Sequence, residues 1–179
     1  MLIFDVYKEP KDLLAKAVRE GRRAYLKSDN TEQVSDHFFN FCVTAHAIRD
    51  WCIQYLEYDE KSIEAQAFHE RCCKSKNLKY CRDIANSLKH MVLRPGKVST
   101  VTSVYETKID TVAIDTLGKK IPNTEIERQS LEVLFPDGTY TSMFLVLIET
   151  IHDWHAIFNE YGIEYDAKCN SILIVGEII

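Results

Sequence analysis

Six side chains that can donate, accept or carry a proton are concentrated in residues 79–90, KYCRDIANSLKH. They are Lys79, Arg82, Asp83, Asn86, Lys89 and His90. At about 100° per residue in a helix, Arg82, Asn86 and His90 lie within about 80° of one another. A guanidinium can hold a phosphate, and an imidazole titrates near neutral pH. This polar stripe could therefore bind an anion or transfer a proton.

The rest of this segment explains how the stripe would be held. Its other face is apolar and should pack against the core; the residues are Cys81, Ile84, Ala85, Leu88 and Val92. Asp83 and Asn86 are three residues apart, and Asn86 and His90 are four apart. Carboxylate, amide and imidazole at these spacings could form a local hydrogen-bond network that sets the protonation state of the histidine.

The charge of the chain is uneven. The net charge is −5, which argues against a general nucleic-acid binder. Residues 71–97 nevertheless hold eight basic residues and one acid, a local charge of +7. Two interpretations stay open: a solvated surface balanced by acids elsewhere in the fold, or an anion site.

A second polar group lies on the preceding long helical segment. His46 and Asp50 are one helical turn apart, with Arg49 beside them, and a carboxylate at that spacing can orient an imidazole. If this surface faces residues 83–90, the two segments form a polar pocket. The alternative is a boundary histidine with a local partner.

Other chemistries have weaker support in the sequence. Metal-ligand residue types occur at His69, Cys72, Cys73, Cys81, His152 and His155, without the paired spacing of a zinc site. No cysteine has the context of a nucleophile, and no glycine-rich phosphate loop is present. We therefore expect neither a metal nor a cofactor.

Hydrophobic periodicity predicts helices over residues 10–28, 31–58, 60–73, 78–93 and 144–163. The fourth should end before Pro95-Gly96, and the fifth near Gly162.

Between the fourth and fifth helices the period changes to that of strands. Residues 98–115 are rich in Val, Thr and Ile, and residues 130–143 contain the turn sequence PDG between two apolar-alternating runs. This pattern predicts an antiparallel hairpin. The apolar end of the chain, residues 171–179, reads as a last strand paired with residues 1–7, because an exposed apolar edge would aggregate.

Together these elements predict an α+β, mainly α, fold in one domain over residues 1–179. The helical bundle covers about residues 10–93 and 142–161, and the small antiparallel sheet is inserted at about residues 98–143. With 46% apolar residues, no signal-like start and no long apolar run, the chain reads as a cytoplasmic protein without a membrane span. Its six cysteines should be reduced and buried.

The Arg82-Asp83 pair followed by His90 on one helix of a small bundle resembles the HEPN superfamily (higher eukaryotes and prokaryotes nucleotide-binding). In that family two copies of an Arg-polar…His motif meet at a dimer interface and form a metal-independent ribonuclease site, and many members act as toxins or in phage defence. The resemblance implies that Arg82 neutralises phosphate, that His90 acts on the ribose 2′-hydroxyl, and that Asp83 occupies the polar position after the arginine.

The spacing departs from that family. Family members usually have four to six residues between Arg and His, whereas seven separate Arg82 from His90 here. Their Cα atoms should then lie about 12 Å apart along a regular helix. A helix irregularity, or Arg and His from different subunits, would bring the groups together. Two function classes follow: an RNA-binding protein or metal-independent ribonuclease of the phage-defence or toxin type, and a non-catalytic interaction or structural module that is homodimeric. In both we expect a homo-oligomer, and a protein partner would be of unknown identity.

Overall fold

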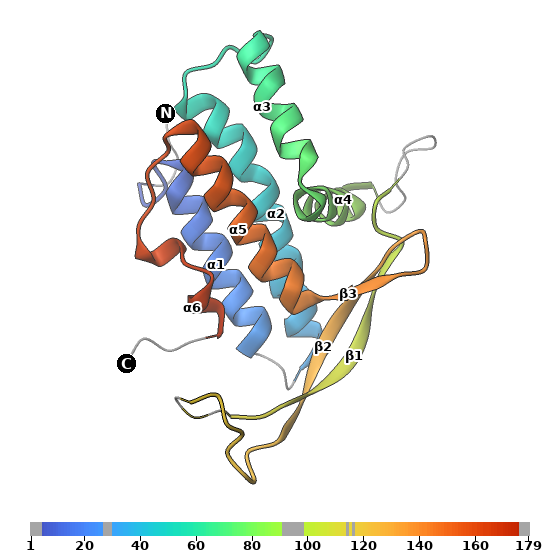
Figure 1. The fold of residues 1–179 in the computed structure, drawn as a ribbon. Coiled ribbons are helices and arrows are strands. Elements are labelled where there is room, and N and C mark those ends of the chain that lie inside the picture. Colours follow the sequence, from blue (N-terminus) through green and yellow to red (C-terminus); the bar gives the residue numbers. More distant parts are fainter. Residues whose placement is uncertain (1–4, 27–29, 91–98, 114, 116, 176–179) are drawn as a thin grey trace.

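Helices make up most of the chain, and a small sheet interrupts them (Figure 1). The computed structural model describes residues 5–26, 30–90, 99–113, 115 and 117–175, apart from the side chains of residues 88–90. The elements are α1 (Pro10–Leu26), α2 (Thr31–Tyr55), α3 (Ile63–Lys74), α4 (Lys76–His90), β1 (Ser103–Thr111), β2 (Ile126–Leu134), β3 (Tyr140–Ser142), α5 (Met143–Tyr161), the 3-10 helix η1 (Ala167–Cys169) and α6 (Ile172–Val175). The predicted class, α+β and mainly α, is confirmed.

Several helices begin and end at residues suited to those positions. Asn30, Ser62 and Ser142 precede α2, α3 and α5, and each side-chain oxygen accepts a hydrogen bond from a backbone N–H of the first turn. Gly162 follows α5 with φ 66°, a left-handed conformation that suits glycine. These local signals explain why the helix boundaries could be approximated from the sequence.

The core lies where α1, α2 and α5 run side by side (Figure 1). Its largest fully buried side chains include Phe41 and Trp154. Gly21 allows α1 to approach its neighbours closely, because a Cβ there would lie 3.2 Å from Ile174 Cδ1 and 3.4 Å from Leu147 Cδ2. The bundle therefore depends on a small residue in the middle of α1.

The sheet has the antiparallel order β1-β2-β3, so the predicted hairpin is confirmed. β1 and β2 pair from Ser103↔Leu134 to Thr111↔Ile126, and their far end extends away from the helices (Figure 1). Phe135 and Gly138 close the β2–β3 turn through backbone hydrogen bonds. Leu131 and Val133 are buried and attach the sheet to the bundle core.

The C-terminal prediction is wrong for the described residues. Residues 172–175 form α6, not a strand, and Ile174 is fully buried beside α1. Asn170 accepts the backbone N–H of Ile172 through its side chain and that of Leu173 through its carbonyl. A short apolar run has no period that separates a strand from a buried helical turn. Residues 1–4 and 176–179, the rest of the predicted pair, lie outside the described residues.

The cysteines largely follow the prediction. Five of them are buried thiols, whereas Cys73 is exposed, which corrects the expectation for that residue. Burial raises the pKa of Cys72 to about 12 and raises that of Cys52 further. Buried thiols with raised pKa values are poor nucleophiles at neutral pH.

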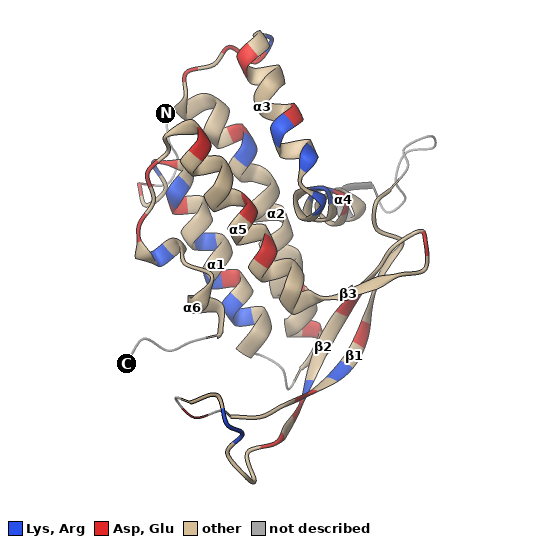
Figure 2. Ribbon diagram, viewed as in Figure 1, with Lys and Arg blue, Asp and Glu red and all other residues tan. Residues whose placement is uncertain are grey.

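Charged side chains on α3 and α4 face acids on α5 (Figure 2). Arg71 pairs with Glu160 at 2.5 Å, and Lys76 lies 3.8 Å from Glu149. Part of the basic run of residues 71–97 is thus balanced by acids from another helix. Among the helices of the described residues, none has the length and apolar character needed to span a membrane.

Candidate anion site between α2 and α4

Helix α4, which carries most of the predicted site, is fixed at its start by α5. Ser75 precedes the helix, and its hydroxyl oxygen accepts the backbone N–H of Leu78 at 3.0 Å. Asp153 of α5 accepts hydrogen bonds from the Ser75 hydroxyl at 2.5 Å and from the Asn77 amide at 2.9 Å. This network sets both the position and the rotation of α4. The helix begins at Lys76, two residues before the predicted start, and residues 91–93 lie outside the described residues.

Asp83 is a buried anchor. Its side chain is 9% exposed, although the sequence placed it beside the solvent-facing stripe. One carboxylate oxygen accepts Nε of Arg82 at 2.8 Å, and the other accepts the backbone N–H and the hydroxyl of Thr100, each at 2.7 Å. Within the described residues Asp83 bonds to these two partners and not to Asn86. It ties α4 to the segment that leads into β1.

The contacts of Asp83 also shift its titration. Burial alone would raise its pKa, but the hydrogen bonds from Arg82 and Thr100 together outweigh burial, so the pKa lies below its ordinary value. Because the folded-state pKa is lowered, the ionised carboxylate stabilises the fold at pH values above the unfolded-state pKa of about 3.9. This stabilisation is lost as the pH falls through the folded-state pKa.

We therefore expect a pH-dependent difference in stability between the wild type and Asp83→Asn. In urea unfolding, the difference should be constant between about pH 5 and 7 and should shrink below about pH 4. A difference that stays unchanged down to pH 2 would contradict the contribution of the ionised carboxylate.

The remaining face of α4 meets α2 at a small hollow, which we call the α2–α4 hollow. His46 and Arg49 of α2 line it together with Lys79 and Arg82 of α4. Trp154 of α5 lines it as well. Its volume is about 20 Å³, enough for one oxygen-sized atom. Part of each predicted polar group thus lies on one hollow: Lys79 and Arg82 of the first, and His46 of the second.

The polar side chains of this hollow share one property, which is that each can donate a hydrogen bond. No carboxylate is among the described residues that line it. The indole N–H of Trp154 is buried without a hydrogen-bond partner among the described residues, and an indole can only donate. The hydrogen bond that Arg82 donates to Asp83 raises the pKa of Arg82, which is cationic at all ordinary pH values. Such a hollow fits an anionic oxygen.

The other predicted site residues are less closely involved. Asp50 is exposed and bonds to Arg49 at 2.9 Å, outside the lining of the hollow. Asn86 is half-buried on α4. The backbone of Lys89 and His90 belongs to α4, but their side chains lie outside the described part of the chain, and with them the predicted roles of these two residues.

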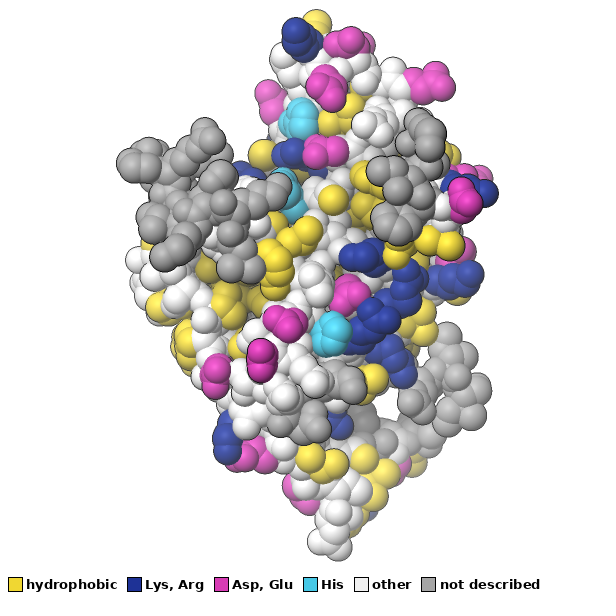
Figure 3. All heavy atoms as spheres, turned by 180° about the vertical axis from the view of Figure 1, so that it is seen from behind, with side chains coloured by type: hydrophobic (Ala, Val, Ile, Leu, Met, Phe, Trp, Pro, Cys, Tyr) yellow, Lys and Arg dark blue, Asp and Glu magenta, His cyan; other side chains and the backbone are white. Residues whose placement is uncertain are grey.

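A second basic surface was missed by the sequence analysis. Figure 3 shows Lys and Arg side chains gathered on the back of the molecule. Helix α1 contributes Lys16, Arg19, Arg22 and Arg23, which we call the α1 basic patch. Lys16 donates to Thr44 at 2.6 Å, and Arg23 pairs with Glu20 at 2.6 Å. The spacing of positions 16, 19 and 23 on one helical face was the available signal.

The histidines of α5 have structural contacts. His152 Nε2 lies 2.9 Å from the hydroxyl of Ser171, and His155 Nε2 lies 2.9 Å from the carbonyl of Cys169. His155 also stacks on Tyr165 with ring centroids 4.5 Å apart. Within the described residues, no three His, Cys, Asp or Glu side chains lie close enough to hold a metal ion.

Comparison with protein-family models, with curated proteins and with solved structures found no match. The functional argument therefore depends on the residues and their geometry.

Proposed function

We propose that this protein binds RNA, and that the α2–α4 hollow holds an oxygen of the RNA phosphate backbone. The observation that supports this most directly is the set of three cationic side chains, Arg49, Lys79 and Arg82, that line the hollow, with no carboxylate among its described lining residues. Cationic side chains that converge on one hollow favour an anionic acceptor there.

Guanidinium groups bind phosphate and carboxylate oxygens alike through charge-assisted hydrogen bonds. The choice of phosphate is supported by the HEPN resemblance, which makes RNA the expected source of the anion. The chain as a whole is acidic, so the contact should be local. With two or three phosphates neutralised, the logarithm of the binding constant should fall with the logarithm of salt concentration with a slope of about −2.

The test is fluorescence anisotropy with an unstructured, fluorescein-labelled RNA of about 20 nucleotides in low salt. Lys79→Gln removes a positive charge from the hollow, and Trp154→Phe removes the indole N–H of a lining residue. We expect each to weaken binding about tenfold, the effect of weakening or losing one interaction with a charged group. Lys74→Gln is the matched control, because Lys74 is an exposed lysine of α3 outside the hollow. Its affinity should stay within about twofold of the wild type.

Two further measurements make this test specific. Trp154→Phe should cost about 2 kcal/mol of stability, since it keeps an aromatic ring but removes three heavy atoms from a fully buried side chain, so its binding is compared at a temperature where the variant is folded. The double variant Arg19→Glu, Arg23→Glu changes the α1 basic patch instead. If that variant abolishes RNA binding while Trp154→Phe and Lys79→Gln bind normally, RNA binds at α1 and the assignment to the hollow is wrong. If the wild type binds no RNA, the proposed function fails.

A second candidate, metal-independent RNA cleavage, is favoured by one observation. The imidazole of His46 lines the same hollow as Arg82, so a side chain of the type used in general acid–base catalysis lies beside a phosphate-binding cation. Cleavage of a mixed RNA pool in the presence of EDTA should be lost in folded Arg82→Gln and in His46→Ala. If cleavage is lost in His90→Ala but not in His46→Ala, the catalytic imidazole is that of His90. If the wild type leaves the RNA pool uncleaved, RNA binding stays as the proposed function.

A further inference from the structure

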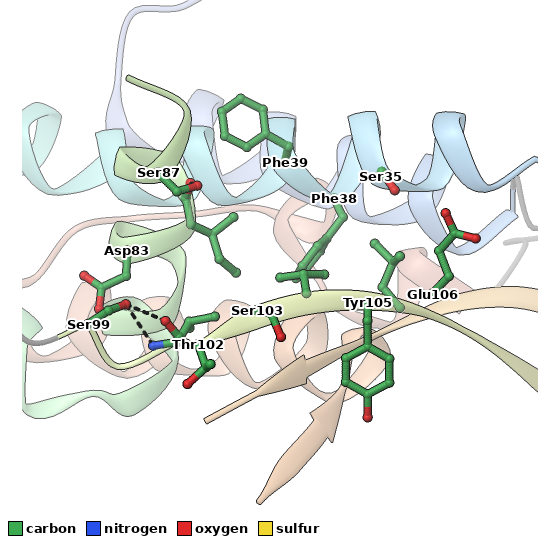
Figure 4. Close-up of a pocket in the computed structure, with 14 residues that line it drawn as sticks. Ser35, Phe38, Phe39, Asp83, Ser87, Ser99, Thr102, Ser103, Tyr105 and Glu106 are labelled. Atoms are coloured by element: carbon green, nitrogen blue, oxygen red, sulfur yellow. Dashed lines mark hydrogen bonds between the residues drawn. The ribbon is translucent and has the colours of Figure 1, made fainter. Parts of the chain in front are cut away.

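A large groove lies between helix α2 and strand β1, and we call it the α2–β1 groove (Figure 4). Its volume is about 850 Å³, within the usual range for ligand sites. Phe38, Ile84 and Leu131 supply apolar lining from α2, α4 and β2. Figure 4 shows Ser35, Phe38 and Phe39 on the helix side, opposite β1.

The groove runs along the free edge of the sheet. In the order β1-β2-β3, the outer edge of β1 has no neighbouring strand among the described residues. Residues 101–106 line the groove without interruption. Consecutive strand residues point to opposite faces, so an unbroken run of lining residues means that the groove meets the backbone edge of the strand. Every second residue of such an edge presents its N–H and C=O outward.

The polar groups of the groove select against an anionic ligand. Among the described residues that line the groove there is no Lys, Arg or His, but there are two acids, Asp83 and Glu106. The oxygens of Asp83 are occupied by Arg82 and Thr100. Glu106 is exposed and forms no ion pair within the described residues, so its carboxylate is available to a cationic group. RNA is therefore a poor occupant of this groove.

We propose that the α2–β1 groove binds an extended peptide segment of a partner protein. The segment adds a strand to the edge of β1 through main-chain hydrogen bonds, and alternate side chains enter the groove. Six residues span about 20 Å in a strand, which matches the six residues of the chain that line the groove. Apolar side chains of the peptide cover Val101 and Val104, which keep exposed surface in the groove, and a lysine or arginine of the peptide lies beside Glu106.

A second copy of the chain fits this groove less well. Its own β1 would bring Glu106 and Asp110 to a groove that already holds two carboxylates, and its Lys108 pairs with Glu127 at 2.7 Å. Like charges opposed across strands are destabilising. A basic partner peptide has the complementary charge, so we assign the groove to a different protein. The proposal is independent of RNA binding at the α2–α4 hollow.

The experiment is selection of a display library of random twelve-residue peptides on the immobilised full-length chain. The folded Ser35→Trp variant, which places a large ring in the groove, serves as the counter-selection target. We expect enriched peptides that alternate apolar and basic residues. Synthetic, fluorescein-labelled forms of these peptides should bind the wild type and should lose at least tenfold in affinity for Ser35→Trp. N-methylation of alternate backbone nitrogens in the peptide should cause a similar loss, because it removes strand hydrogen bonds.

Charge variants complete the test. Glu106→Lys should weaken the enriched peptides at least fivefold, whereas Glu125→Lys should leave binding within twofold, since Glu125 is an exposed acid outside the groove. The proposal is overturned by a library that yields no enriched peptides, by enriched peptides that bind Ser35→Trp equally, or by an acidic consensus. It is also overturned if the wild type sediments as a dimer that Ser35→Trp converts to a monomer, because the occupant is then a second copy.

Discussion

Asp83→Ala is expected to lower the free energy of unfolding by about 3 kcal/mol. The substitution removes three hydrogen bonds from a carboxylate that is 9% exposed. It leaves the N–H and hydroxyl of Thr100 without their acceptor, and it leaves the guanidinium of Arg82 half-buried beside no counter-charge. Breaking a buried, hydrogen-bonded ion pair from one side is among the most costly single substitutions. Urea unfolding at pH 7, followed by circular dichroism, measures the difference.

The chain supplies a matched control at Asp50. Asp50 pairs with the preceding Arg49 just as Asp83 pairs with the preceding Arg82, but its side chain is 62% exposed. Exposed ion pairs contribute little, so Asp50→Ala should change stability by no more than about 0.5 kcal/mol. If the two substitutions lower the free energy of unfolding equally, the buried hydrogen bonds of Asp83 do not stabilise the fold more than an exposed ion pair does.

Asp153→Ala is expected to cost about 2 to 3 kcal/mol, because it removes the acceptor that joins α5 to the start of α4. Ser75 and Asn77 are both buried, and both donate to the same carboxylate oxygen of Asp153. Without it, the buried hydroxyl and amide lose their acceptor, and a negative charge near the N-terminal end of α4 is lost. Urea unfolding gives the total effect, and hydrogen exchange should show the largest loss of protection in the first turns of α4.

Glu149→Ala provides the comparison on the same helix. Glu149 lies 3.8 Å from Lys76 and is 43% exposed, so it also faces the start of α4, but from the surface. Its removal should cost no more than about 0.5 kcal/mol. If hydrogen exchange in α4 is unchanged in Asp153→Ala, the network around Ser75 does not hold the helix in place.

Much of the fold was predictable because its signals are local. Helix α2 repeats apolar residues at three and four positions and begins at a side chain that caps it, so Asn30 and Phe41 indicate its start and its buried face. The β2–β3 turn is similarly local, because the PDG sequence places Gly138 at φ 83°. The strand predicted for the terminal apolar run is wrong, because the length and composition of that run suit a strand and a buried helical turn equally.

The candidate site was only partly predictable. Arg82 and Lys79 were chosen from their spacing on one helix, and His46 from its spacing on another; that the two sets line one hollow required the packing of α2 on α4. The unpartnered N–H of Trp154 had no sequence signal at all. Its significance comes from what surrounds it, which is a property of three helices together.

The sequence by itself determined where helices α1 to α5 and the antiparallel hairpin form, and it limited the chemistry to residue types that hold anions or move protons. Only the tertiary structure decided that Asp83 is an anchor, that basic residues of α2 and α4 meet, and that β1 keeps an open edge beside α2. Periodicity and caps act over a few neighbouring residues, so they can be read along the chain. Burial, hydrogen-bond partners and cavities depend on residues far apart in the sequence, and they exist only once the elements have packed.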